Sequence, residues 1–358
     1  MLKVKEIQVP GYERVIEGLD ETTGFHCFIA VHNTSLGPAM GGTRIFPYTS
    51  TQDALEDALR LAKAMTYKSA MAENGLGGGK SVIMANPHTQ KTKQLLYQFA
   101  ELLNTLEGKY IAAEDMGTTP EDMAIIKEKS PYVAAMRTEK SSGDPSRFTA
   151  WGVYRGIQAV CKKLWDDACV RKRTIAIQGL GNVGGKLANM LFWAGADLIL
   201  CDKDRKVAHD HALLYGAEVV DITEFHKVRC DILAPCAIGG VINADTIPQL
   251  HCRAVAGAAN NQLREPSDAI RLRERGILYA PDYVINAGGI INAAGEFNPA
   301  GYDPKKARNK VNHIYDTLVE IFDRAEKENL STEQVVDKMT EDKLARGTGK
   351  RHHPIHLR

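Results

Sequence analysis

The sequence has almost no net charge and no long apolar run. Its 358 residues include 45 Lys and Arg against 44 Asp and Glu, so the formal net charge is +1. Such a balance creates no overall field that would favour nucleic acid or an anionic membrane surface. No apolar stretch approaches bilayer-spanning length, and the opening M-L-K-V-K-E-I lacks the apolar core of a signal peptide. We therefore predict no nucleic-acid partner and no membrane partner.

Paired cysteine motifs are also missing. The seven cysteines are an odd number, without a C-x-x-C pair and without clustering near histidine. This usage is typical of reduced thiols and argues against both a disulfide framework and a metal site. Three histidines lie in the terminal K-R-H-H-P-I-H-L-R, for which we favour a flexible or oligomer-contacting tail. These features predict a soluble cytoplasmic protein without a metal ion.

The chain has 358 residues, which is more than a single hydrophobic core usually serves. Its length therefore predicts two domains. The best linker candidate is S-S-G-D-P-S, residues 141–146, after which strand and helix patterns alternate. We predict an α/β fold with a first domain over residues 1–143 and a second over residues 144–330. Residues 331–358 are predicted to form a tail that packs back on the first domain.

Two lysines and a glycine run mark the stretch T-Y-K-S-A-M-A-E-N-G-L-G-G-G-K, residues 66–80. The β-type run S-V-I-M-A follows, so the pattern predicts a glycine-rich turn that brings Lys80 to the mouth of a strand. A lysine held away from water beside another cation can lose its proton near neutral pH and act as a base. The alternative is a solvated Lys80 in a surface turn. Helical periodicity leaves Lys68 undecided between the surface and a cleft.

Two further glycine-rich or acidic segments accompany these lysines. G-P-A-M-G-G-T-R, residues 37–44, is predicted to be a loop. The run from Tyr110 to Ala113 predicts a strand whose carboxyl end carries Asp115, followed by a helix with Pro120 in its first turn. Enzymes with α/β folds place catalytic acids at such strand ends, but helix caps also lie there, so both interpretations of Asp115 stay open.

The second half of the chain contains a dinucleotide-binding pattern. The β-type run from Thr174 to Gln178 precedes G-L-G-N-V-G, a helix follows, and a predicted strand over residues 197–201 leads to Asp202. Glycines let the backbone approach a pyrophosphate at a helix amino end, and the acid accepts hydrogen bonds from ribose hydroxyls. Asp202 would repel a 2′-phosphate, so we predict NAD. The predicted loop contacts are Gly179, Gly181, Asn182, Val183 and Gly184.

These motifs, together with M-T-Y-K-S-A, A-A-E-D-M-G-T-T and V-I-N-A-G-G-I-I-N, resemble the amino-acid dehydrogenase superfamily of glutamate, leucine, phenylalanine and valine enzymes. The resemblance is closest to the leucine dehydrogenase branch. It implies an amino-terminal substrate and oligomerisation domain, a Rossmann-type domain and an active-site cleft between them. It also implies a homo-oligomer of two to eight subunits that oxidatively deaminates branched-chain L-amino acids with NAD.

The resemblance assigns roles to individual residues. Lys68 would bind the substrate carboxylate, Lys80 would be the general base, and Asp115 would transfer protons to and from the amine. Thr149 resembles the threonine that contacts the nicotinamide carboxamide, and Asn261 is expected near both nicotinamide and substrate. The other expected substrate positions are Met40, Gly41, Gly42, Ala113, Asn286, Ile290 and Ala293.

Other interpretations make different demands on the sequence. The asparagines at the strand ends could instead satisfy loop backbone groups. A 2-hydroxy-acid dehydrogenase would need a His–acid pair, but none of the glycine or strand-end motifs contains histidine. A catalytically inactive dinucleotide sensor would be expected to lack Lys68, Lys80 or Asp115, and all three are present. Preference for phenylalanine or tryptophan is the alternative to an aliphatic substrate.

Overall fold

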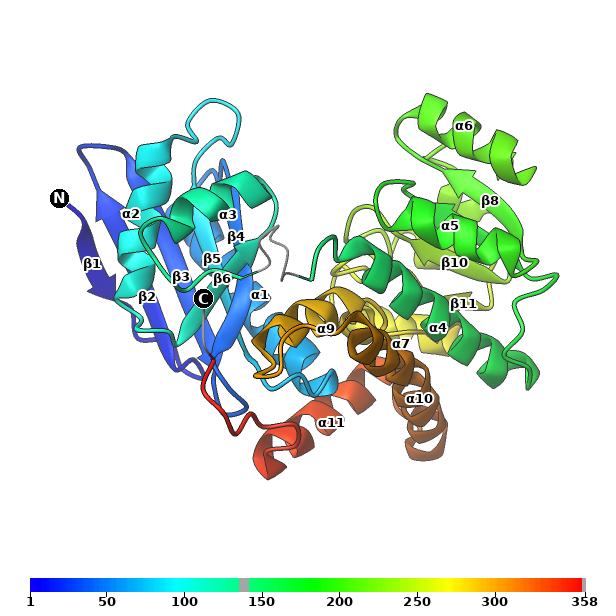
Figure 1. Cartoon of the computed structure of the whole chain (residues 1–358). Coiled ribbons are helices and arrows are strands. Elements are labelled where there is room, and N and C mark those ends of the chain that lie inside the picture. Colours follow the sequence, from blue (N-terminus) through cyan, green and yellow to red (C-terminus); the bar gives the residue numbers. More distant parts are fainter. Residues whose placement is uncertain (135–141, 356–358) are drawn as a thin grey trace. The chain divides into compact units, whose positions relative to one another are not determined.

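The computed structural model describes residues 1–134 and 142–355 (Figure 1). The chain forms two compact units. Unit 1 contains Met1–Gly143, Ala293–Asp303 and Thr340–Arg358, and unit 2 contains Asp144–Asn292 and Pro304–Met339. The segment Ala293–Asp303, which we expected in the second domain, therefore groups with unit 1 through its packing. The functional division of the chain stays a prediction.

Unit 1 is built on a mixed six-stranded sheet in the order β1-β2-β3-β5-β4-β6. Strands β1 to β3 and β5 pair antiparallel, whereas β4 runs parallel to both β5 and β6. The strands are β1 (Lys3–Glu6), β2 (Arg14–Asp20), β3 (Phe25–Asn33), β4 (Ala39–Phe46), β5 (Gly77–Met84) and β6 (Tyr110–Glu114).

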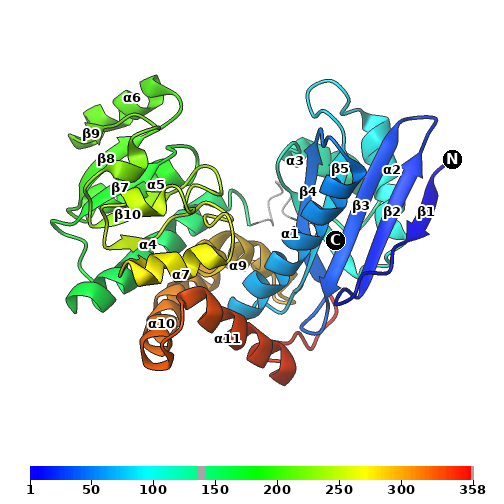
Figure 2. The ribbon, with the colours of Figure 1, turned by 180° about the vertical axis from the view of Figure 1, so that it is seen from behind.

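Helices cover both faces of this sheet. The small residues Ala54, Ala58 and Ala62 of α1 (Thr51–Met71) pack on one face, so this helix approaches the sheet closely (Figure 2). The leucine-rich α2 (Lys93–Asn104) and the capped α3 (Pro120–Lys127) bury their apolar sides on the other face. The two cores enclose most of the inner strands β5 and β4, and β6 borders β4 at the edge of the sheet. The candidate site lies on these three strands.

The structure corrects two expectations for the glycine-rich segments. Residues 37–44 are not simply a loop, since β4 begins at Ala39. The run Gly77–Gly79 is not a turn but the start of β5. A Cβ at Gly78 would lie 2.0 Å from the backbone nitrogen of Thr66 in α1, and one at Gly79 would lie 2.7 Å from the ring of Tyr110. The glycines are needed for close packing of neighbouring elements rather than for a positive φ.

Unit 2 contains a parallel sheet in the order β12-β11-β10-β7-β8-β9. Two of its strands, β7 (Thr174–Gln178) and β8 (Asp197–Cys201), have the bounds predicted from sequence. Strands β8 and β9 are added on one side of β7, and β10, β11 and β12 are added on its other side. The order of the strands therefore switches between β7 and β10, and open α/β sheets bind ligands at such switch points. The remaining strands are β9 (Glu218–Val219), β10 (Ile232–Pro235), β11 (Ala254–Val255) and β12 (Leu278–Tyr279).

Helices surround the sheet of unit 2, and three short 3-10 turns complete the two units. In the described part of the chain, no helix is long and apolar enough to cross a lipid bilayer. The helices are α4 (Ser146–Trp165), α5 (Gly184–Trp193), α6 (Arg205–Tyr215), α7 (Ser267–Glu274), α8 (Asp282–Ile285), α9 (Gly288–Ala294), α10 (Pro304–Glu328) and α11 (Thr332–Arg346), and the 3-10 turns are η1 (Phe225–Lys227), η2 (Ile247–Gln249) and η3 (Gly295–Phe297).

Candidate active site

Strand register brings the predicted catalytic residues of unit 1 together. Met40 of β4 is paired with Gly78 of β5 and with Ile111 of β6. Side chains on one face of a strand recur every second residue. The next level of this face therefore carries Gly42, Lys80 and Ala113, and Asp115 follows one further step beyond the end of β6.

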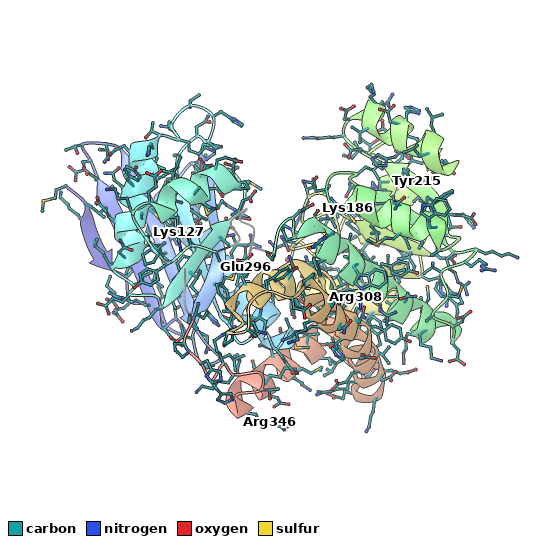
Figure 3. All side chains as sticks on the ribbon, viewed as in Figure 1. Lys127, Lys186, Tyr215, Glu296, Arg308 and Arg346 are labelled. Carbon is teal, nitrogen blue, oxygen red and sulfur yellow. The ribbon has the colours of Figure 1, made fainter. Side chains whose placement is uncertain are left out.

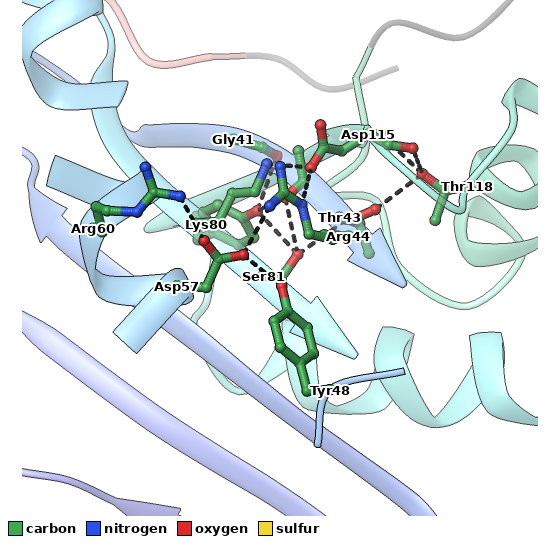
Figure 4. Close-up of polar contacts among 12 residues, drawn as sticks. Gly41, Thr43, Arg44, Tyr48, Asp57, Arg60, Lys80, Ser81, Asp115 and Thr118 are labelled. Atoms are coloured by element: carbon green, nitrogen blue, oxygen red, sulfur yellow. Dashed lines mark hydrogen bonds and ion pairs between the residues drawn. The ribbon is translucent and has the colours of Figure 1, made fainter. Parts of the chain in front are cut away.

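Lys80 and Asp115 form a direct ion pair, with 2.5 Å between Lys80 Nζ and Asp115 Oδ2 (Figure 4). Lys80 is only 5% exposed, because it projects from the middle of β5 beneath α1. The backbone of Asp115 is fixed by Thr118, whose hydroxyl accepts the Asp115 N–H at 2.9 Å and lies 2.9 Å from the Thr43 carbonyl, to which it can donate. The carboxylate is thus held against the ammonium group by the turn that starts α3.

The surroundings tune the two groups in different ways. Burial is the largest influence on Lys80 and lowers its pKa, and the positive charge of Arg44 adds to this, while Asp115 opposes it. Burial pushes the pKa of Asp115 upward, but Lys80 and Arg44 outweigh it and hold that pKa below its usual value. The site therefore combines an anionic carboxylate with a lysine whose proton is easier to remove than usual, as a general base requires.

Arg44 is a charged residue of the candidate site that the sequence interpretation missed. Its Nε lies 3.1 Å from Asp115 Oδ2, and one terminal nitrogen lies 2.8 Å from Asp57 Oδ2. Asp57 also accepts hydrogen bonds from the Tyr48 hydroxyl at 2.5 Å and from Arg60 at 2.8 Å. Arg44 is thus a cation that acts on both members of the pair. Its place two residues after Gly42, on the same face of β4, was the available signal.

Lys68 lies in the last turn of α1 and is half-buried. The same turn packs on β5, since Ser69 donates to the Gly77 carbonyl at 3.2 Å. The structure therefore places Lys68 next to the glycine run of β5. Its predicted role as the carboxylate-binding residue stays a prediction.

Three of the four apolar side chains expected in the substrate pocket fall into one cluster of unit 1. Met40 and Ala293 are buried, and Ala113 is half-buried against them. Ile290 precedes Ala293 by one turn of α9 but belongs to unit 2. The other members, all apolar, are Leu76, Ile111, Ala134, Ala294, Phe297 and the half-buried Ile355.

A side chain would be excluded at the two glycines of β4 for different reasons. A Cβ at Gly41 would lie 1.8 Å from the Gly79 carbonyl, so Gly41 allows β4 and β5 to pack closely. A Cβ at Gly42 would lie 2.5 Å from Asp115 Cβ and 3.0 Å from Lys80 Nζ. Gly42 therefore leaves the space that the ion pair occupies.

This space makes a prediction for Gly42→Ala. The added methyl must displace Asp115 or Lys80, and a shift of about 1 Å at reacting groups can reduce the rate on the order of 100-fold. We expect kcat to fall by about that factor in steady-state assays, with little change in the binding of dinucleotide to unit 2. A variant with kcat within twofold of the wild type would show that the position of the pair is not critical.

In unit 2, the predicted dinucleotide loop has the geometry that a pyrophosphate requires. Gly179 has φ +90°, and a Cβ at Gly184 would lie 1.8 Å from the Gly179 carbonyl, so α5 starts directly against the end of β7. Gly181 faces open space, and Val183 at the N-cap of α5 supplies no side-chain cap. These residues fit a dinucleotide, because the backbone is open at a helix amino end. The backbone carbonyl of the exposed Asn182 accepts a hydrogen bond from Lys186 at 2.9 Å. Lys186 is labelled in Figure 3.

Asp202 stands at the end of β8, beside this loop. One carboxylate oxygen accepts the Leu180 N–H at 2.7 Å and the other accepts the Asp204 N–H at 3.0 Å. Each oxygen retains capacity for a second hydrogen bond, so the carboxylate can still receive ribose hydroxyls. Three basic residues follow Asp202, and two of them are engaged in ion pairs: Arg205 pairs with Asp221, and Lys206 pairs with Asp210. The third, Lys203, is exposed and could favour NADP.

The remaining predicted positions lie in the loops and helix starts of unit 2. Thr149 is in the first turn of α4, and its hydroxyl donates to the Pro145 carbonyl at 3.2 Å. Asn286 donates to the Ala258 carbonyl at 3.0 Å, while its own side-chain oxygen is buried and has no partner among the described residues. Asn261 adopts φ +52° and accepts the Gly240 N–H at 2.7 Å through its carbonyl. Both asparagines therefore support loop backbone, whatever they bind.

Within residues 1–134 and 142–355, no group of three or more His, Cys, Asp or Glu side chains could hold a metal ion.

Comparisons with known proteins decide the family. The sequence model described as Glu/Leu/Phe/Val dehydrogenase, dimerisation domain, matches residues 13–132. The model described as Glutamate/Leucine/Phenylalanine/Valine dehydrogenase matches residues 199–342. Leucine dehydrogenase of Geobacillus stearothermophilus is 44% identical over 341 residues, which cover 95% of this chain and 92% of that protein. The chain belongs to the Glu/Leu/Phe/Val dehydrogenase family.

Other members of the Glu/Leu/Phe/Val dehydrogenase family are similar at nearly the same level. Phenylalanine dehydrogenase of Caldalkalibacillus thermarum is 41% identical, with 94% of this chain and 92% of that protein covered. The crystal structure of L-tryptophan dehydrogenase from Nostoc punctiforme matches with a TM-score of 0.82 and 40% identity, covering 94% of this chain and 97% of that one. The predicted family and two-domain α/β fold are thus confirmed, and the protein is an amino-acid dehydrogenase of an NAD(P)-dependent family.

Proposed function

We propose that the protein catalyses the reversible, NAD-dependent oxidative deamination of branched-chain L-amino acids, with leucine, valine and isoleucine as substrates. An L-amino acid, NAD⁺ and water give a 2-oxo acid, ammonium, NADH and a proton. The observation that carries the proposal is the buried Lys80–Asp115 ion pair on the same sheet face as the apolar cluster around Met40. The charged pair suits the amino-acid end of such a substrate, and the apolar cluster suits its aliphatic side chain.

The residues of unit 1 divide the proton chemistry between them. Lys68 binds the substrate carboxylate, and Asp115 takes a proton from the substrate ammonium group so that the nitrogen lone pair becomes available. When bound, NAD⁺ supplies the acceptor for the hydride that leaves the substrate Cα. Lys80 then removes a proton from the water that attacks the resulting imine, and Asp115 returns a proton to the departing nitrogen. Arg44 keeps Asp115 oriented throughout.

The apolar cluster supports an aliphatic side chain. The buried side chains around Met40 are apolar, so placing the γ-carboxylate of glutamate among them would cost more free energy than placing an aliphatic side chain there. Discrimination among apolar substrates is weaker, because each methylene contributes only about 1–3 kcal/mol. The names of the relatives include leucine, phenylalanine and tryptophan dehydrogenases, so the aromatic amino acids belong in any test.

We also propose a homo-oligomer that acts in the cytoplasm. The match of residues 13–132 to a dimerisation domain supports association through unit 1. Strand β1 is exposed along its length at the edge of the sheet, and such edges favour pairing with another chain. The seven cysteines are all unpaired, which suits a reducing compartment.

Asp202 should set the cofactor preference. Asp202→Asn keeps the shape but removes the charge that would repel a 2′-phosphate, and a charged hydrogen bond contributes about 1.5–3 kcal/mol. We expect the ratio of kcat/KM for NADP⁺ to that for NAD⁺ to rise at least about 10-fold. Asp197→Asn, which neutralises an exposed carboxylate at the opposite end of β8, is the control. An unchanged ratio in Asp202→Asn would remove Asp202 from the cofactor site.

A substrate panel tests the proposal. NADH formation is followed at a fixed NAD⁺ concentration with L-leucine, L-valine, L-isoleucine, L-phenylalanine, L-tryptophan and L-glutamate. We expect the highest kcat/KM with the three aliphatic substrates and no turnover of glutamate. Higher kcat/KM for an aromatic amino acid would overturn the substrate assignment but keep the chemistry of Lys80 and Asp115.

A further inference from the structure

The chain after α11 follows a defined path along unit 1 (Figure 1). Lys343, in the last turn of α11, forms an ion pair with Glu73. Gly349 has φ +77°, and a Cβ there would lie 2.8 Å from the Cα of Glu73. The tail therefore lies in backbone contact with the segment that connects α1 to β5, directly before the glycine run.

Arg351 binds the tail to three separate segments of unit 1. Its backbone N–H donates to the Leu36 carbonyl at 2.8 Å. Its guanidinium donates at 3.0 Å to the Gly75 carbonyl and at 3.0 Å to the Phe297 carbonyl, with a longer contact of 3.5 Å to Asn74. A planar group with several fixed donors suits such a bridge between carbonyls. The tail thus ties the start of β5 to the end of η3.

The segments that Arg351 joins are walls of the apolar cluster. Gly75 precedes Leu76, and both Leu76 and Phe297 are cluster members. Four residues beyond Arg351, Ile355 packs against the same cluster, which contains Met40 and Ala293. The tail therefore contributes a side chain to the group of residues that we assign to the substrate side chain.

The cluster is also continuous with the catalytic pair. Met40 is two residues before Gly42 on β4, and Ala113 is two residues before Asp115 at the end of β6. The half-buried members of the cluster are Ala113, at the end nearest the pair, and Ile355 from the tail. A substrate bound at the Lys80–Asp115 pair would extend its apolar side chain along this face, past Ala113 and toward the residues that Ile355 contacts.

We propose that the C-terminal tail forms a wall of the side-chain pocket, with Ile355 as a specificity-determining residue and Arg351 as the positioning residue that holds it. The inference rests on the proposed function, because it concerns the pocket of that reaction. The wall limits the length of the substrate side chain. Removing atoms at Ile355 therefore favours larger substrates, and adding atoms disfavours them.

The test compares kcat/KM for L-phenylalanine with kcat/KM for L-leucine in the full-length enzyme. Ile355→Ala is expected to raise this ratio about 10-fold or more, and Ile355→Trp to lower it by a similar factor, as expected for methylene-sized changes in a pocket. Arg351→Ala should raise the ratio, as Ile355→Ala does. Arg351→Lys should give a ratio between those of the wild type and Arg351→Ala. His353→Ala changes an exposed tail residue and should leave the ratio unchanged.

The outcomes separate this inference from the proposed function. Ratios within twofold of the wild type in both Ile355 variants, with normal turnover of L-leucine, would overturn the tail assignment and leave the deamination reaction standing. A fall in thermal stability of Arg351→Ala without a change in the ratio would overturn its positioning role. A wild-type enzyme that oxidises none of the amino acids would overturn the proposed function, and the pocket wall with it.

Discussion

Replacing Lys80 with methionine should reduce kcat for L-leucine by about 100- to 10,000-fold, the range that a general base contributes. Methionine keeps most of the length of the side chain but cannot accept a proton from water. Lys80 is buried in the middle of β5, so no neighbouring surface lysine can take its place by a change of rotamer. The measurement is kcat from steady-state NADH formation over a range of L-leucine concentrations.

A matched lysine provides the control for this variant. Lys163 of α4 pairs with Asp323 of α10 at 2.8 Å and with Glu326 of α10 at 2.7 Å, and all three residues belong to unit 2. Lys163→Met removes these ion pairs and should leave kcat within about threefold of the wild type, at some cost in thermal stability. Equal losses of kcat in the two variants would show that Lys80 has only a structural role.

Replacing Asp115 with asparagine should also reduce kcat by about 100-fold or more, because the proton carrier for the substrate amine is lost. The residual activity should show a shifted pH profile. Asp115 raises the pKa of Lys80, so its neutralisation lowers that pKa. Since the neutral amine is the active form, kcat/KM rises with pH through this pKa, and the acidic limb of the profile should move to lower pH.

Arg44→Met should move the same limb in the opposite direction. The charge of Arg44 lowers the pKa of Lys80, so its removal raises that pKa and shifts the acidic limb to higher pH. The apparent pKa values belong to the coupled pair rather than to one residue, but the two signs remain opposite. Profiles of kcat/KM against pH for both variants check this, and shifts of the same sign would contradict the assigned electrostatics.

Local patterns in the sequence predicted the elements of unit 2 well. Strands β7 and β8 have the predicted bounds, because the apolar β-type run that forms each strand is contained within its own segment. The glycine run before Lys80 could not be interpreted in this way. Its cause is the approach of Thr66 from α1 and of Tyr110 from β6, and such contacts depend on the tertiary fold.

The candidate site was predictable in its parts but not in its connections. Lys80 and Asp115 were identified from their motifs, whereas the role of Arg44 depends on the register of β4 with its two neighbours. Ile355 shows the same limit more strongly. It is separated from Met40 by most of the chain, and nothing in K-R-H-H-P-I-H-L-R indicates a place beside the apolar cluster.

The most direct test of the account measures the products of the reaction with L-leucine. NADH, ammonia and 2-oxo acid are quantified in the same wild-type sample, with 2-hydroxy-4-methylpentanoate as the alternative substrate. The account predicts one NADH and one ammonia for each 2-oxo acid from L-leucine, and no NADH from the hydroxy acid. NADH formed from the hydroxy acid, or dinucleotide binding without oxidation of any amino acid, would contradict the account.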